Sequence, residues 1–226
     1  MRKFSLSVCL LAVACSSALA QSSKATAAIT TVSVAGCSTN STVSILPCVT
    51  DWVNVTQPLT VKTSNSTSLF VNTSLVTGLY TSTQVKGNDT GATSSAIASA
   101  AVSIRVVLDG VVYAFPDTAG AGVTFDARVQ TLTANLGNIF TATCAASPTT
   151  CTLTPEQITL ALDTSSAHSF DFILLNVGAG THTVQVQAQT ASTSTGSTGG
   201  VAISKALYGL GSVTIDVVRL VHDFSF

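Results

Sequence analysis

Residues 181–189 read Thr181-His-Thr-Val-Gln-Val-Gln-Ala-Gln189, and apolar and polar side chains alternate through most of this stretch. Val184, Val186 and Ala188 fall on one face of an extended chain, and the glutamines fall on the other. A period of two is typical of an antiparallel β-strand with one buried and one wet face. This stretch therefore predicts a protein built from half-buried strands.

The same period recurs along most of the remaining chain. The apolar row that begins at Val102 and ends at Leu108 runs into Asp109-Gly110, a strong hairpin signal because both positions tolerate a positive φ. Further strands are predicted at residues 27–34, 59–63, 68–73, 79–85, 123–125, 129–132, 170–174, 201–207 and 213–221. In the last strand the apolar phase shifts from Val217 to Val218, which indicates a bulge or burial of both faces.

About ten short strands without an alternating helical pattern favour an all-β fold, namely an antiparallel, jelly-roll-like β-sandwich. At most one short helix is expected near residues 154–160, where Thr154 can cap and Pro155 can take the first helical position. The polar run at residues 190–200 is predicted to be a flexible loop. Residues 21–226 are expected to form a single domain.

Residues 1–20 have the three parts of a secretory signal peptide. Arg2 and Lys3 precede an apolar stretch, and Ala18-Leu19-Ala20 forms an A-x-A cleavage site. An uncleaved anchor, or a lipoprotein that uses Cys15, is the weaker alternative. We expect a secreted, extracellular or cell-surface protein, periplasmic if the source is Gram-negative, without a transmembrane segment.

The cysteines left after residue 20 agree with export. Cys37, Cys48, Cys144 and Cys151 allow three pairings, and the local pairs Cys37–Cys48 and Cys144–Cys151 need the least chain closure. A four-thiolate metal site is the rival, but no C-x-x-C pair supports it. Five N-x-S/T triplets are candidate glycosylation sites, with their asparagines at Asn40, Asn54, Asn65, Asn72 and Asn88.

Charged side chains are scarce, at 8% of the chain against a typical 25% or so, while 64 of the 226 residues are Ser or Thr. The near balance of 9 basic and 10 acidic residues excludes a phosphate-binding patch and therefore a nucleic-acid partner. Only three histidines and one glutamate are available for acid–base chemistry. We therefore expect a non-catalytic protein.

One stretch nevertheless suggests a secreted hydrolase. His168 has Ser166, Ser169 and Asp171 as sequence neighbours, and His182 is a second candidate base. No G-x-S-x-G elbow holds a nucleophile, and adjacent residues of a strand point to opposite faces. We assign no catalytic residue and keep the hydrolase as an alternative.

Calcium and sugars are two further ligands that the sequence brings into question. Asp109, Asp117 and Asp126 lie near turns and could bind calcium, but they lack the clustered spacing of a calcium loop, so no cofactor is predicted. Trp52 could offer an aromatic platform to a sugar, which makes a carbohydrate-binding module the other alternative.

Three stretches carry a resemblance to known modules: Ser68-Leu-Phe-Val71 with Gly78-Leu-Tyr80, the run from Val177 to Gln187, and Gly211-Ser-Val-Thr-Ile-Asp-Val-Val-Arg-Leu220. They resemble the last core strands of C1q/TNF-like and phage tail-fibre jelly rolls, and the chain is similar to uncharacterised exported bacterial β-sandwich proteins. The resemblance implies recognition or assembly, often as a trimer, without catalytic residues.

Together these features predict an exported β-sandwich that acts in binding, adhesion or assembly, with a protein or glycan as its ligand. Few charges guard its sheet edges, so self-association into a homo-oligomer, by edge pairing or by symmetric packing, is expected.

Overall fold

The computed structural model describes residues 24–28, 38–41, 47–64, 67–87, 91–137, 140–144, 151–197 and 199–218. Every regular element in these ranges is a β-strand, which confirms the all-β class. The strands are β1 (Lys24–Ala28), β2 (Ser38–Ser41), β3 (Cys48–Val49), β4 (Val53–Asn54), β5 (Leu59–Thr63), β6 (Thr67–Lys86), β7 (Ser94–Leu108), β8 (Val112–Tyr113), β9 (Val123–Ala134), β10 (Phe140–Cys144), β11 (Cys151–Pro155), β12 (Gln157–Val177), β13 (Gly180–Gly196) and β14 (Gly200–Val218). The predicted signal peptide lies outside the described residues.

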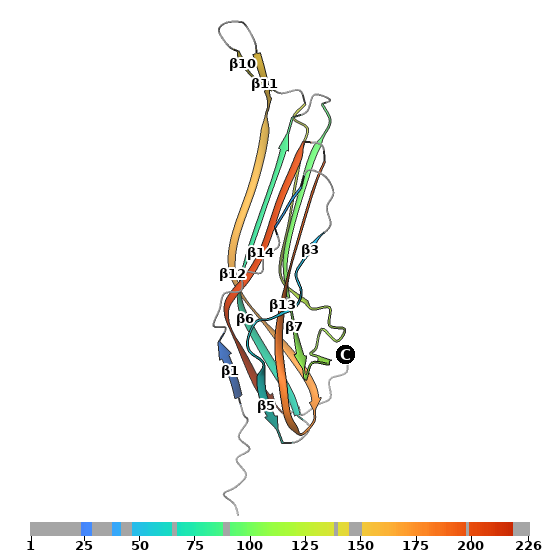
Figure 1. Cartoon of the computed structure of the whole chain (residues 1–226), viewed down its shortest axis with the longest axis vertical. Coiled ribbons are helices and arrows are strands. Elements are labelled where there is room, and N and C mark those ends of the chain that lie inside the picture. The colour runs from blue at the N-terminus through green and yellow to red at the C-terminus, as the bar shows by residue number, and fades with distance from the viewer. Residues whose placement is uncertain are drawn as a thin grey trace, which may run out of the picture.

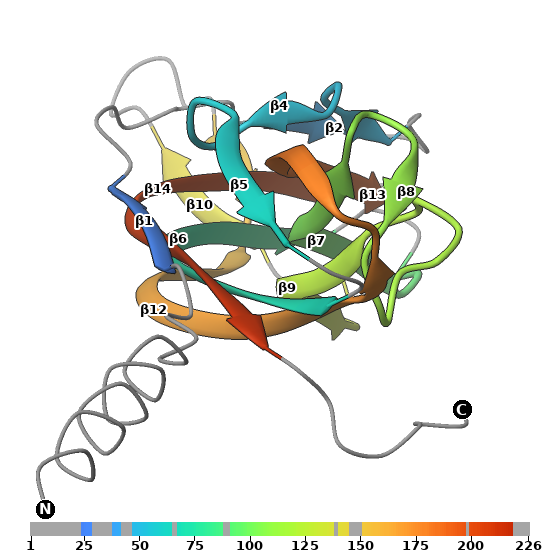
Figure 2. The same ribbon diagram turned by 90° about the horizontal axis from the view of Figure 1, so that it is seen from below.

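Two antiparallel sheets pack face to face along the length of an elongated molecule (Figure 1). The first has the order β1-β14-β6-β12, with β2 also on β14. In the second, β13 pairs with β7 on one side and with the short strands β3, β4 and β5 on the other, and β7 pairs in turn with β8 and β9. Seen along the long axis, β12 and β9 lie at the same side of the two layers (Figure 2).

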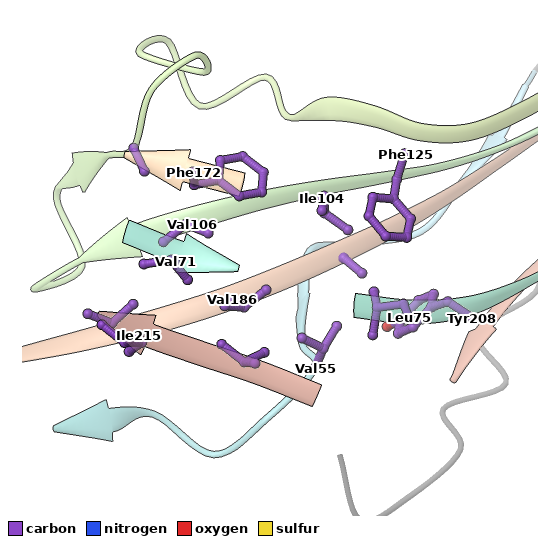
Figure 3. Packing of buried hydrophobic residues seen from close by; sticks show 14 of the residues in the cluster. Val55, Val71, Leu75, Ile104, Val106, Phe125, Phe172, Val186, Tyr208 and Ile215 are labelled. Atoms are coloured by element: carbon purple, nitrogen blue, oxygen red, sulfur yellow. The ribbon is translucent and has the colours of Figure 1, made fainter. Parts of the chain in front are cut away.

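The two ends of the core are built from different side chains. At the end nearer β5, large apolar residues from both sheets interdigitate, among them Leu75, Ile104 and Phe172 (Figure 3). At the end nearer the β10–β11 hairpin, the buried apolar residues are Val85 and three alanines, Ala96, Ala98 and Ala202. Buried hydroxyl groups fill the space beside them, as in the 3.2 Å contact between Ser194 Oγ and Ser204 Oγ. The core thus changes from bulky to small and polar along the molecule.

The predicted hairpin at Asp109-Gly110 is present, with φ of 52° and 75° at the two residues. The strands predicted at 68–73 and 79–85 are halves of the one long strand β6. Gly78 does not interrupt β6: buried and half-buried residues of the strand alternate on both sides of it. Leu207 packs where a side chain at position 78 would stand. The bulge predicted near Val217 and Val218 is absent, because Gly211 to Val218 pair in regular register with β6; an irregularity that was not predicted lies at Gly209–Gly211 of β14.

Two local predictions were wrong. Residues 154–160 form no helix, because Thr154 and Pro155 end β11 and the alternating run after them belongs to β12. Residues 190–200 are not a loop: 190–196 continue β13, and β14 begins at Gly200. Thr190, Ser192 and Ser194 are buried at every second position, so hydroxyl side chains take the inward places that apolar residues usually hold.

Candidate functional site

Strand β12 is an edge strand: it is the last strand of the first sheet, and for most of its length it has a strand neighbour on one side only. It pairs with β6 from Gln157 to Leu174. On its other side, the described residues provide a single bridge, in which Phe115 N donates to Ile173 O at 2.8 Å and Ile173 N donates to Phe115 O at 3.1 Å. Backbone direction alternates along a strand, so each odd-numbered residue from Gln157 to Asp171 also turns its N–H and C=O to this side. These eight residues are called the open edge.

An apolar row lies on the inner face of the same strand. Ile158, Leu160 and Leu162 pair with the buried residues Val85, Thr83 and Thr81 of β6 and so face the core side of the sheet. They are nevertheless 45%, 41% and 44% exposed, although β9 of the second sheet reaches the backbone carbonyls of Leu160 and Leu162. The open edge and the apolar row together are a candidate interaction surface of backbone groups and side chains.

Charge does not protect this edge. Between residues 157 and 170, β12 carries one charged side chain, Asp163, and neither Lys, Arg nor Pro. Natural sheets usually guard their edges with such residues or with a bulge, and the register with β6 is regular until Leu174. β12 therefore has the properties of a strand that can accept a further strand.

Polar side chains of β9 bridge the two layers beside β12. Gln130 Nε2 donates to Leu160 O at 2.6 Å and to Thr83 Oγ1 at 2.7 Å, and Thr81 Oγ1 donates to Gln130 Oε1 at 2.8 Å. Arg128 donates to Leu162 O at 3.3 Å. These contacts tie the exposed half of β12 to β9.

His168 belongs to the same row of cross-layer contacts. Asp126 Oδ2 lies 3.3 Å from His168 Nε2, and Ser166 Oγ lies 2.8 Å from the same nitrogen. In a Ser–His–Asp triad the acid and the nucleophile contact different ring nitrogens, so this geometry is not that of a triad. Asp171 and Ser169 bind Asn72 Nδ2 on the outer face of the sheet, away from the histidine.

His182 occupies a second polar cluster, at the end of the sandwich nearer β5. His182 Nδ1 lies 2.8 Å from Asp109 Oδ2, and His182 Nε2 lies 3.0 Å from Gly178 O. Both partners are acceptors, so both ring nitrogens donate only when the imidazole is protonated. The hydrogen bond to Asp109 raises the pKa of His182, and the same bond lowers the pKa of Asp109. The cluster joins the β7–β8 turn to the β12–β13 loop.

Trp52 is part of a stack on the outer face of the second sheet. The Arg105 guanidinium lies 4.3 Å from the Trp52 ring centre and 5.4 Å from that of Tyr113. A side chain at Gly122 would collide with Trp52, and one at Gly120 would collide with Tyr113. Both rings are thus already engaged by the chain itself.

The three aspartates considered for calcium lie in separate places. Asp109 binds His182 and Thr183 N, Asp117 Oδ2 accepts a hydrogen bond from Gly122 N at 2.9 Å, and Asp126 contacts His168. Across the described ranges, no three His, Cys, Asp or Glu residues gather as metal ligands would.

One predicted disulfide is present. Cys144 and Cys151 are bonded across the β10–β11 hairpin, with an S–S distance of 2.05 Å. Cys48 lies in β3, and Cys37, its predicted partner, lies outside the described residues.

Three of the five candidate glycosylation asparagines lie within the residues that the structure describes. Asn54 accepts a hydrogen bond from Gln187, Asn72 donates to Asp171, and Asn40 lies in β2. Asn65 and Asn88 are outside the described ranges.

The open edge was missed from sequence, although a signal for it exists. Ile158-Thr-Leu-Ala-Leu162 alternates with a period of two, which favours a strand over the helix that Thr154 and Pro155 suggested. Gln130 gave no such signal, because its partners are 47 to 49 residues away on β6 and 30 residues away on β12.

Comparisons with known proteins assign this chain to no family. No family model and no curated protein matches it. Solved structures of the infectious bursal disease virus VP2 subviral particle and of the Gx strain virus align with 10% and 11% identity over 89% and 88% of this chain, with TM-scores of 0.17 and 0.15. The chain spans 42% and 43% of their length. Similarity this low carries no argument about function.

The described part of the chain contains no helix that could cross a membrane.

Proposed function

We propose that this chain is an exported, non-catalytic β-sandwich that binds or assembles by accepting a strand at the open edge of β12. The observation that carries the proposal is the run of eight residues whose backbone N–H and C=O groups face away from β6. Strand addition gains affinity from main-chain hydrogen bonds and specificity from alternate side chains, here the row Ile158, Leu160 and Leu162. The disulfide Cys144–Cys151 supports an oxidising, extracellular location.

The alternatives have less support in the geometry. A sugar platform needs an open ring face, whereas Trp52 is stacked by Arg105 and packed at Gly122. A hydrolase needs a base oriented by its carboxylate, whereas Asp126 and Ser166 share one nitrogen of His168. The resemblance to jelly-roll recognition modules points in the same direction as the edge.

A lysine-flanked peptide of alternating Thr and Val, labelled for fluorescence anisotropy, tests strand addition. The wild-type protein should bind it saturably. Ala161→Pro removes one outward N–H without removing a hydrogen bond to β6, and should weaken binding about tenfold or more. Ala161→Ser keeps the N–H and should bind like wild type. Failure of the wild-type protein to bind, or equal binding by the proline variant, would overturn the proposal.

A further inference from the structure

We infer that the partner of the open edge is the open edge of a second copy of this chain, paired antiparallel about a two-fold axis at Leu160. The inference rests on the proposed function, because it requires that β12 accept a strand. The first sheets of the two copies would then form one continuous sheet.

Symmetry restricts the registers that two identical edges can adopt. The outward backbone groups belong to odd-numbered residues, so odd residues must face odd residues, and the axis must pass through a residue position. An axis at Leu160 places Leu160 opposite its own copy and Ile158 opposite Leu162. This register matches every member of the apolar row with another member.

Neighbouring registers match the row less well. An axis at Ala161 leaves Ile158 facing Thr164, and an axis at Leu162 leaves two of the three apolar residues facing Thr164 and Ser166. An axis at Asp163 sets two carboxylates directly opposite each other, which is destabilising. In the Leu160 register each Asp163 instead faces the neutral Gln157, so the only charge on this half of β12 meets no like charge.

The edge is also held ready for a partner. Gln130 and Arg128 donate to the carbonyls of Leu160 and Leu162, which face β6, so they support the centre of the proposed pairing without occupying the outward groups of the odd-numbered residues. A strand that is already extended loses little conformational freedom on binding. The paired segment, residues 157–163 of each copy, is short, so a reversible dimer is expected rather than an obligate one.

Sedimentation of the purified protein from about 1 µM to about 500 µM tests for the dimer. The wild-type protein should pass from monomer to dimer across this range. Leu160→Lys sets two cations opposite each other at the axis, and should weaken dimerisation at least tenfold. Val129→Lys, on the outer face of β9 where Val129 is 69% exposed, is the matched control and should dimerise like wild type.

Cross-linking tests the register. Leu160 would face its copy in a non-hydrogen-bonded pair, where Cα atoms are about 4.5 Å apart, within the range of a disulfide. Leu160→Cys should therefore form a reducible dimer under mild oxidation. Leu162→Cys should not, because four residues of strand, about 13 Å, would separate the two positions.

Two results would overturn the inference: a wild-type protein that stays monomeric over the whole range, or cross-linking by Leu162→Cys equal to that by Leu160→Cys. A monomer that still binds the Thr–Val peptide would leave strand addition standing and assign the edge to another protein. A monomer that does not bind the peptide would remove both proposals.

Discussion

Replacing Gln130 by Leu should destabilise the protein far more than a typical surface substitution. The Gln130 side chain is 5% exposed and takes part in three hydrogen bonds, with Thr81, Thr83 and the carbonyl of Leu160. Leucine is of similar size but can form none of them. Two hydroxyl groups that are fully buried, those of Thr81 and Thr83, would lose this partner.

The expected loss follows from the groups left behind. Leaving a buried polar group without its partner costs about 1–3 kcal/mol, so losing the contacts of two hydroxyls and one carbonyl should cost about 2–4 kcal/mol in free energy of unfolding. That is a large share of the 5–15 kcal/mol or so typical of a folded domain. Urea denaturation should show a lower midpoint with an unchanged slope.

Two further variants separate buried hydrogen bonding from simple loss of an amide. Gln84→Leu removes one exposed hydrogen bond to Thr159, and should change stability by less than about 0.5 kcal/mol. Adding Thr81→Val and Thr83→Val to Gln130→Leu removes the stranded hydroxyls and should recover part of the loss. A urea midpoint of Gln130→Leu equal to that of wild type would refute this reasoning. So would a triple variant that loses more unfolding free energy than the three single variants lose in sum.

Two other predictions concern the polar cluster and the aromatic stack. Because the pKa of His182 is raised and that of Asp109 lowered in the folded state, their contribution to stability should be complete between about pH 4 and pH 6.5. It should fall at higher pH as His182 loses its proton, and at lower pH as Asp109 gains one. Unfolding midpoints from pH 3 to pH 9 should show these two declines in wild type, and His182→Gln should lack the upper one. Arg105→Ala should lower the free energy of unfolding by about 1–2 kcal/mol and shift the fluorescence emission of Trp52, the only tryptophan. An unchanged emission spectrum would contradict the stacked geometry.

Sequence periodicity predicted the fold class because burial imposes it directly. The row formed by Val184, Val186 and Ala188 is buried, as expected. The chain turns at Asp109-Gly110, where both φ angles are positive. Errors arose where residue type and periodicity disagreed. Proline and threonine suggested a helix at 154–160, and hydroxyl-rich composition suggested a loop at 190–200.

The candidate site was only partly predictable. Alternation in Ile158-Thr-Leu-Ala-Leu162 is visible in the sequence, but that β12 is the last strand of its sheet depends on the pairing of all the others. Of the predicted neighbours of His168, Ser166 contacts its ring, but the carboxylate beside it is Asp126 and not Asp171. The contact of His168 with Asp126 crosses from one sheet to the other, and no local pattern specifies such a contact.

Because the buried side chains become small and polar toward the β10–β11 hairpin, the molecule should open more easily at that end. Alanine and serine bury little apolar area, so the half that holds Ala96, Ala98 and Ala202 contributes less to cooperative stability than the half around Phe172. Amide hydrogens in that half should exchange with solvent sooner, because the free energy of local opening there should be well below that of global unfolding. The exposed part of β12 lies in this less protected half, so a strand docked at its edge would slow exchange where the sandwich is weakest.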